Sequence, residues 1–300
     1  MDLHPLAGHQ DRLRGIVLMI AAVAIFAVMD ALLKHLVATY PPLQVACLRG
    51  ASSLPFVFLT YAATRRLAEL KPRSLPMHLA RGILSILMIW CFIWALARMS
   101  MANTYAITLS APLLVVPFAA LFLKEKTDAH GWAAILVGLA GVLVILRPTA
   151  SGFISLAGLA AFATAVCWAV VVVMLRIMAA SETTASIVFW FLVLTSLGAG
   201  ALSAPGWVPI EARDWGWIGL LGLTGWVAQH LITEAFRLAP ASTIAPFEYM
   251  SILWGACIDW VVWRTVPGAR MFAGAAIVVA AGLYLMYREK SRFTVLPEPI

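Results

Sequence analysis

The chain has 300 residues, of which 63% are hydrophobic and 12% charged, far from the roughly half apolar and quarter charged composition of a soluble domain. Its mean hydropathy of +0.93 points the same way. The net charge of +7 arises mostly from Lys and Arg in short segments beside apolar runs, which is typical of orientation signals and argues against nucleic-acid binding. The composition predicts an integral membrane protein without a sizeable soluble domain.

Ten apolar runs are long enough to cross a bilayer, and breaks rich in Pro, Gly or charged residues separate them. The predicted helices cover residues 14–37, 42–62, 77–97, 102–123, 131–147, 153–175, 184–203, 214–236, 241–263 and 270–287. The first run is too long for the apolar part of a signal peptide, so we expect it to be the first span. The predicted class is all-α, with ten transmembrane helices.

Most Lys and Arg residues fall on one side of the bilayer when these runs are threaded alternately. With an even number of spans, that side also holds both termini, and the positive-inside rule makes it cytoplasmic. We therefore expect a multi-pass protein of the bacterial inner membrane, with the lipid bilayer as its surroundings.

The two halves of the chain resemble each other weakly. "RMSMANTYAI" from Arg98 and "RLAPASTIAP" from Arg237 both place Arg before a short polar break and the next span. A unit with five spans must insert its second copy upside down, and inverted repeats are typical of transporters. The predicted units are residues 1–148, residues 149–288 and a cytoplasmic tail, residues 289–300.

Two segments resemble known membrane proteins: "ANTYAITLSAPLLVVPFAALFLKEKTDAHGWAAILVGLAGVLVILRP", residues 102–148, and "ASTIAPFEYMSILWGACIDWVVWRTVP", residues 241–267. Both are similar to the EamA-like branch of the drug/metabolite transporter superfamily. The resemblance implies two five-helix repeats around a central cavity that carry small metabolites without ATP. The aromatic-rich interior is most similar to YddG-type aromatic amino-acid exporters. Glu125 matches an acidic position of this family, whereas Arg264 departs from it in the second repeat.

Several ionisable residues lie within the predicted spans, where they tend to pair or face a wet cavity. Asp30 and Arg49 fall at similar depth in an antiparallel hairpin, which predicts a salt bridge that is either structural or coupled to gating. Glu248 lies in the ninth span near His230 at the end of the eighth. This cluster either binds a substrate ammonium or relays a proton, or it only ties the two helices together. For Asp259 we expect an interfacial ion contact with Arg264.

Aromatic residues in the middle of spans offer flat apolar faces with a polar handle, which suits an amphipathic organic substrate. Plain packing or lipid contact remains the alternative for each of them. With the polar cluster, the candidate substrate-binding residues are Trp90, Trp94, Trp168, Trp226, His230, Glu248 and Tyr249.

Proline and glycine mark two further features of the spans. Pro112, Pro117 and Pro246 remove backbone hydrogen bonds and are predicted hinges. Gly141 and Gly274, in the last span of each half, are expected to allow close helix approach.

The sequence contains no motif that predicts catalysis, a metal or a cofactor. It lacks H-E-x-x-H, G-x-S-x-G and a P-loop, and its four Cys residues lie singly in apolar runs. We expect a secondary transporter that exports neutral aromatic or branched amino acids or related metabolites. A single copy of the chain is expected to be sufficient for transport. The alternatives are uptake of riboflavin, nucleotide-type metabolites or S-adenosylmethionine and, from other classes, a channel or an intramembrane enzyme.

Overall fold

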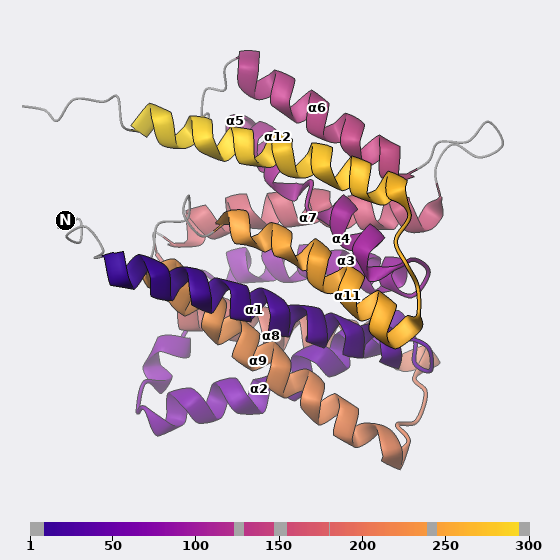
Figure 1. Cartoon of the computed structure of the whole chain (residues 1–300). Coiled ribbons are helices and arrows are strands. Elements are labelled where there is room, and N and C mark those ends of the chain that lie inside the picture. Colours follow the sequence, from indigo (N-terminus) through magenta and orange to yellow (C-terminus); the bar gives the residue numbers. More distant parts are fainter. Residues whose placement is uncertain (1–8, 123–128, 147–154, 180, 239–244, 294–300) are drawn as a thin grey trace, which may run out of the picture.

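The computed structural model describes residues 9–122, 129–146, 155–179, 181–238 and 245–293. Every regular element in these residues is an α-helix or a short 3-10 turn, so the predicted all-helical class is confirmed (Figure 1). Helices suit such apolar runs because all backbone hydrogen bonds form within the segment, as lipid requires.

The described helices follow the predicted runs closely. Those of the first half are α1 (His9–Leu36), α2 (Pro42–Ala63), α3 (Leu75–Leu96), α4 (Met101–Thr108), α5 (Ala111–Phe122) and α6 (Ala129–Leu146). Those of the second half are α7 (Leu156–Ala179), α8 (Thr184–Ser203), α9 (Trp215–Leu238), α11 (Met250–Trp263) and α12 (Ala269–Phe293). The 3-10 turns are η1 (Leu67–Leu70), η2 (Ala204–Gly206), η3 (Ala212–Asp214) and η4 (Ala245–Tyr249).

Local sequence explains where several helices begin. Pro42 opens α2, a position at which the missing N–H costs no helical hydrogen bond. Ser100 and Thr183 cap α4 and α8, because each side-chain oxygen accepts a backbone N–H from three residues further on, at 3.2 and 3.1 Å.

Five of the described helices are long and apolar enough to cross a membrane. They cover residues Leu13–Leu36, Pro42–Ala63, Leu75–Leu96, Leu156–Leu175 and Thr184–Gly206. The fourth predicted span is broken between α4 and α5, and the ninth begins with the 3-10 turn η4 before α11. The chain is therefore a multi-pass membrane protein in which two predicted spans are interrupted.

The helices pair in a pattern that is unchanged when the two halves are exchanged. α1 packs on α9 as α7 packs on α3, and α2 packs on α9 as α8 packs on α3. The remaining large contacts join a helix to its own counterpart: α2 to α8, and α6 to α12 (Figure 1). This exchange makes α3 and α9 matched helices, and likewise α8 and α2.

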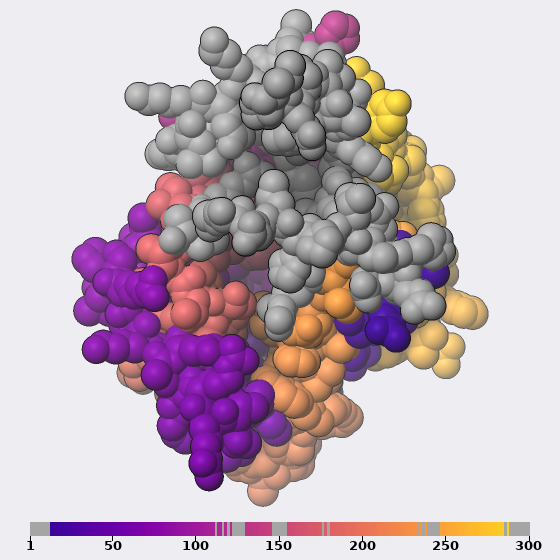
Figure 2. All heavy atoms as spheres, turned by 90° about the vertical axis from the view of Figure 1, so that its left-hand side faces the viewer, coloured from indigo at the N-terminus to yellow at the C-terminus, as the bar shows by residue number. Residues whose placement is uncertain are grey.

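The helices run roughly side by side, which gives the molecule two ends (Figure 1). We call the end at which α3 and α8 begin the α3 end, and the end at which α2 and α9 begin the α9 end. The start of α1 and the end of α12 both lie at the α3 end. Seen from the α3 end, the surface is recessed between the salmon residues of α7 and α8 and the orange residues of α9 and η4 (Figure 2).

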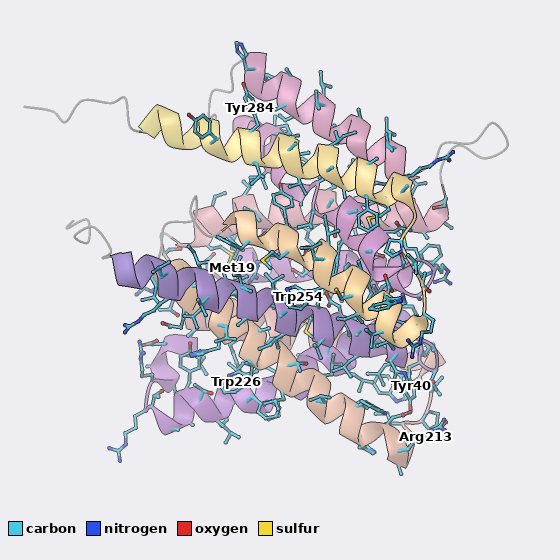
Figure 3. The ribbon with its side chains drawn as sticks, viewed as in Figure 1. Met19, Tyr40, Arg213, Trp226, Trp254 and Tyr284 are labelled. Carbon is cyan, nitrogen blue, oxygen red and sulfur yellow. The ribbon has the colours of Figure 1, made fainter. Side chains whose placement is uncertain are left out.

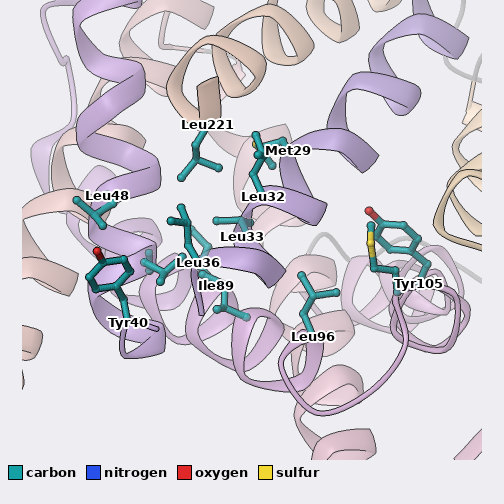
Figure 4. Close-up of a cluster of buried hydrophobic side chains, with 14 of the residues drawn as sticks. Met29, Leu32, Leu33, Leu36, Tyr40, Leu48, Ile89, Leu96, Tyr105 and Leu221 are labelled. Atoms are coloured by element: carbon teal, nitrogen blue, oxygen red, sulfur yellow. The ribbon is translucent and has the colours of Figure 1, made fainter. Parts of the chain in front are cut away.

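The largest buried apolar cluster joins α1, α2, α3, α4 and α9. Leu33 and Leu36 of α1 and Leu221 of α9 are fully buried in it (Figure 4). The predicted close approach of the last helices is confirmed, since a Cβ on Gly274 would lie 2.7 Å from the carbonyl oxygen of Gly141. Packing without a Cβ therefore fixes the α6–α12 contact.

Candidate functional site

Asp30, on α1, lies in a buried polar network with groups from α4. The carboxylate is only 8% exposed, and it accepts a hydrogen bond of 2.7 Å from the Tyr105 hydroxyl. Tyr105 packs against Gly255 of α11, where a Cβ would lie 2.6 Å from the ring. A carboxylate at this depth needs such a donor, and the bond ties α1 to α4.

Arg49 is close to Asp30 but does not form a direct ion pair with it. The two charges interact electrostatically, yet their pair is absent from the contacts within 4.0 Å among the described residues. The guanidinium instead lies 5.9 Å from the centre of the Phe191 ring on α8. Tyr105 takes the place that the sequence assigned to Arg49, and the role of the Asp30–Arg49 pair in gating stays a prediction.

Asp259 provides a second tie around α1. Its side chain is fully buried, and its carboxylate accepts hydrogen bonds from the Lys34 ammonium at 3.0 Å and from the backbone N–H of Ala102 at 2.9 Å. Lys34 also lies 4.4 Å from the Trp263 ring centre. The expected ion contact between Asp259 and Arg264 is wrong, because Lys34 neutralises the acid. Arg264 instead closes α11 in a left-handed conformation with φ of 54°.

Some predicted substrate-binding residues gather on α9. The Trp226 ring stacks on Phe56 of α2 and on His230, with ring centres 6.0 and 6.2 Å apart. Trp226 projects from the middle of α9 (Figure 3). Three rings from two helices therefore form a partly exposed aromatic stack, suited to a planar or cationic ligand group.

The remaining Trp candidates do not join this stack. Trp90 and Trp168 are 40% and 41% exposed. The Arg98 guanidinium lies over the Trp94 ring, 3.8 Å from its centre. Arg98 also lines a shallow hollow of about 320 Å³, together with Val37, Pro42 and Ala97. Trp94 therefore belongs to the α9 end of the bundle.

Glu248 and Tyr249 lie in η4, near the α3 end. Glu248 is half-buried, and Ser251 donates to its carbonyl oxygen at 2.7 Å. Tyr249 is buried against Gly282, and its hydroxyl has no hydrogen-bond partner among the described residues. Within the described contacts nothing joins Glu248 to His230, so that cluster stays a prediction.

The predicted hinge prolines mark the two interrupted helices. Pro112 lies in the first turn of α5, directly after the break from α4, where proline is tolerated, and Pro117 lies inside α5. Pro246 lies in η4, directly before α11. Their hinge function stays a prediction, and Glu125 lies outside the described residues.

At the α9 end, side chains fasten the loop before α2 to the loop before α9, a contact that the sequence did not reveal. Tyr40 donates to Asp214 at 2.6 Å and accepts the N–H of Glu211 at 3.0 Å. Gln44 bonds both backbone groups of Val208, at 2.7 and 2.9 Å. The hydrogen bond to Asp214, together with burial, raises the pKa of Tyr40. We call this set the Tyr40 latch (Figure 3).

At the α3 end, the matched loops are fastened by a carboxylate. Glu182 accepts the N–H groups of Ser74 and Arg73 at 2.6 and 2.9 Å, and His78 Nε2 lies 3.3 Å away. Burial by itself raises the pKa of Glu182, but these hydrogen bonds outweigh it and hold the pKa below its ordinary value. We call this set the Glu182 latch. It joins the start of α3 to the start of α8.

A polar face of α3 continues inward from the Glu182 latch. It consists of His78, Arg81 and Ser85, all buried, at the i, i+3 and i+7 spacing of one helix face. Arg81 Nη1 donates to the Ile187 carbonyl at 2.8 Å. Sequence reasoning missed this face, although the helical spacing of the three residues is visible in the sequence.

The fold and its apolar helices define a multi-pass membrane protein, and comparison with known proteins identifies the family. The family model described as the EamA-like transporter family matches residues 13–147 and again residues 155–288. The chain belongs to this family. Glu, Asp, His and Cys residues form no group of three or more that could hold a metal in the described part of the chain.

Known relatives carry several kinds of small molecule. The chain is 30% identical to the pseudopaline exporter CntI of Pseudomonas aeruginosa, over 92% of this chain and 97% of that protein. It is 27% identical to a riboflavin transporter of Vibrio cholerae, covering 93% and 95%. It is also 22% identical to an S-adenosylmethionine uptake transporter of Rickettsia prowazekii, covering 93% and 94%.

A solved crystal structure shares the fold. It aligns with a TM-score of 0.62 at 19% identity and covers 96% of this chain and 99% of that one. The relatives are transporters rather than enzymes, but they differ in substrate, so the narrower similarity to YddG-type exporters is a matter for proposal.

Proposed function

We propose that this protein is a secondary transporter that exports neutral aromatic or branched amino acids, or related small metabolites, by alternating access. The observation that carries this proposal is the pair of matched latches at opposite ends of the bundle. Each fastens the loop before one helix of the α2/α8 pair to the loop before one helix of the α9/α3 pair. A transporter that opens to one side at a time needs a releasable closure at each end.

The proposed mechanism exchanges the two latches. Release of the Glu182 latch would separate α3 from α8 and open the α3 end, while the Tyr40 latch keeps the other end closed. Release of the Tyr40 latch would do the reverse. The exchangeable helix pairing supports an inverted repeat of ten spans, because the same contacts recur in both halves. The start of α1 and the end of α12, both at the α3 end, would then face the cytoplasm.

The substrate class is inferred from the aromatic stack and the buried charges. Trp226, Phe56 and His230 offer ring faces to an aromatic or aliphatic side chain. The named relatives favour a second candidate, uptake of riboflavin or S-adenosylmethionine. A planar ring system suits the same stack, so the choice requires flux data.

Reconstituted protein in proteoliposomes tests the proposal. We expect saturable flux of labelled L-phenylalanine or L-leucine, chemically unchanged after transport, and little flux of riboflavin or S-adenosylmethionine. Non-saturating flux would indicate a channel, and an altered product would indicate an enzyme. Riboflavin flux without amino-acid flux would replace the first candidate by the second. Flux should require no cofactor and should occur at protein densities that leave single copies per vesicle.

A further inference from the structure

A buried arginine, Arg81, and a half-buried one, Arg49, lie near the same aromatic ring where α2, α3 and α8 meet. The guanidinium carbon of Arg81 lies 5.1 Å from the Phe191 ring centre, and that of Arg49 lies 5.9 Å from it. Arg81 is 7% exposed. Two like charges beside a single ring, within helices that cross the membrane, are costly unless an anion accompanies them.

The described residues supply these arginines with little negative charge. Asp30 interacts with Arg49 only at longer range, and its short hydrogen bond comes from Tyr105. Glu182 and His78 lie beyond Arg81 toward the α3 end and bond to each other and to backbone N–H groups. Among the described contacts Arg81 makes no ion pair; its hydrogen bond goes to a backbone carbonyl. The pair therefore has uncompensated positive charge.

Buried donors beside Arg81 also lack partners. Arg81 Nε and Ser85 Oγ have no hydrogen-bond partner within the described residues, and Ser85 is 1% exposed. Both belong to the polar face of α3. Buried polar atoms without partners are rare in proteins and call for a ligand or a water.

We call the contact between α3 and α8 the α3–α8 seam, and the matching contact between α9 and α2 the α9–α2 seam. The α9–α2 seam shows that helix packing alone does not require Arg81. Gly82 of α3 closes on Leu194 of α8, as Gly222 of α9 closes on Ser52 of α2. Counted from these glycines, Arg81 matches Leu221, and Ser85 matches Gly225. Leu221 is fully buried and apolar. The contact between α9 and α2 therefore forms with Leu221 at the position that Arg81 occupies in α3. Arg81 is not needed for helix packing, which indicates a functional role.

We propose that Arg81 and Arg49 bind the carboxylate of the transported molecule. A guanidinium presents a planar fork of N–H donors that matches a carboxylate, which lysine does not. Arg81 Nε and Ser85 Oγ supply the donors, and Arg49 adds charge from α2. This inference rests on the proposed transport function and narrows it: the substrate is an organic acid or zwitterion with a free carboxylate, which excludes riboflavin as the preferred ligand.

Thermal unfolding of the detergent-solubilised protein, followed by its Trp fluorescence, tests this site. The probes are L-phenylalanine and L-leucine, their C-terminal amides, and riboflavin. We expect an acid to raise the unfolding temperature of the wild type, and its amide to do so only at concentrations at least about tenfold higher. This preference should be lost in Arg81→Gln and weakened in Arg49→Gln and Arg81→Lys. Arg213→Gln is the matched control, since Arg213 is exposed and pairs with Glu211.

The preference for acid over amide is a ratio within one variant, so it survives a general loss of stability. If Arg81→Gln does not fold, the acid preference of Arg81→Lys and of Arg49→Gln tests the site instead. Equal shifts by acid and amide in the wild type, no shift by any acid, or an acid preference retained in both Arg81→Gln and Arg49→Gln would overturn the site. Flux in proteoliposomes separates the two proposals. Acid-selective binding without flux rejects transport and keeps the site, whereas flux without acid preference rejects only the site.

Discussion

The α3–α8 seam and the α9–α2 seam use one architecture with opposite chemistry. Each begins at a latch and continues past a glycine that brings two helices into contact. Behind the Tyr40 latch the α9 face is apolar, with Leu221 buried, whereas behind the Glu182 latch the α3 face carries His78, Arg81 and Ser85. The contact between α9 and α2 is closed by packing and by a hydrogen bond from the Ser53 hydroxyl to the Gly222 carbonyl at 3.3 Å. The α3 face instead holds charged and polar groups that can accept a ligand or water.

This difference matters for the proposed transport cycle, in which the two halves exchange roles. If the two seams were identical, closure of the α3 end and closure of the α9 end would be equally stable. A dry seam is stabilised by burial of apolar surface, roughly 25 cal/mol per Å². A polar seam is sensitive to charge and to a bound anion. At the proposed carboxylate site the substrate would act on the contact between α3 and α8 more than on the contact between α9 and α2, which gives a reason for the asymmetry.

The largest expected effect comes from filling the glycine contacts. A Cβ on Gly222 would lie 2.3 Å from the Ser52 carbonyl oxygen, whereas a Cβ on Gly82 would meet the Leu194 side chain at 2.9 Å. Backbone cannot move aside as a side chain can, so Gly222→Ala should cost about 3 kcal/mol and Gly82→Ala about 1 kcal/mol. Thermal unfolding checks the order. Gly219→Ala is the control, because nothing lies within 4 Å of its Cβ position.

Removing each latch residue should have the next largest effect. Glu182→Ala leaves the N–H groups of Ser74 and Arg73 without their acceptor, and we expect a loss of about 2 kcal/mol. Tyr40→Phe removes the donor to Asp214 and should cost about 1–2 kcal/mol. Hydrogen exchange should accelerate in residues 181–187 for the first variant and in residues 207–214 for the second. Faster exchange at both ends in both variants would contradict independent latches.

The two latches should fail at opposite ends of the pH scale. Glu182 has a lowered pKa, so its contribution is complete above the ordinary value of about 4.3 and is lost as pH falls through the lowered one. Tyr40 has a raised pKa, so its contribution is complete below about 10 and is lost as pH rises through the raised one.

The measurement is the difference in unfolding temperature between wild type and each variant. The difference for Glu182→Ala should shrink below about pH 4, and that for Tyr40→Phe above about pH 10. Both should stay constant between these limits. A Glu182→Ala difference that shrinks between pH 7 and 5 would contradict a carboxylate with a lowered pKa as the titrating group.

The helices were predictable from sequence, whereas the seams were only partly so. Apolar runs of span length with proline or charged breaks determine helix bounds locally, and the close α6–α12 contact follows from small residues at Gly141 and Gly274. The partners of Asp30 and Asp259 come from α4 and α1, distant in sequence, and no local pattern gives such packing. The sequence therefore predicted that Asp30 would be a buried charge with a partner, but it did not predict that Tyr105 would be that partner.

The smallest expected effects distinguish the latches from the residues around them. Gln44 and Ser186 occupy matched positions near the starts of α2 and α8, and both are fully buried. Gln44→Ala removes two hydrogen bonds to Val208, but Val208 is exposed enough for water to replace them, so we expect a loss of about 1 kcal/mol.

Ser186→Ala removes only a contact of 3.4 Å to His78 Nε2, which is long for a hydrogen bond, and should cost less than about 0.5 kcal/mol. Unfolding temperatures of the two variants, measured side by side, check the order. If Ser186→Ala proved the more costly, the closure at the α3 end would depend on the hydroxyl–imidazole contact rather than on Glu182. His78, rather than the Glu182 carboxylate, would then be the main group that closes the α3 end.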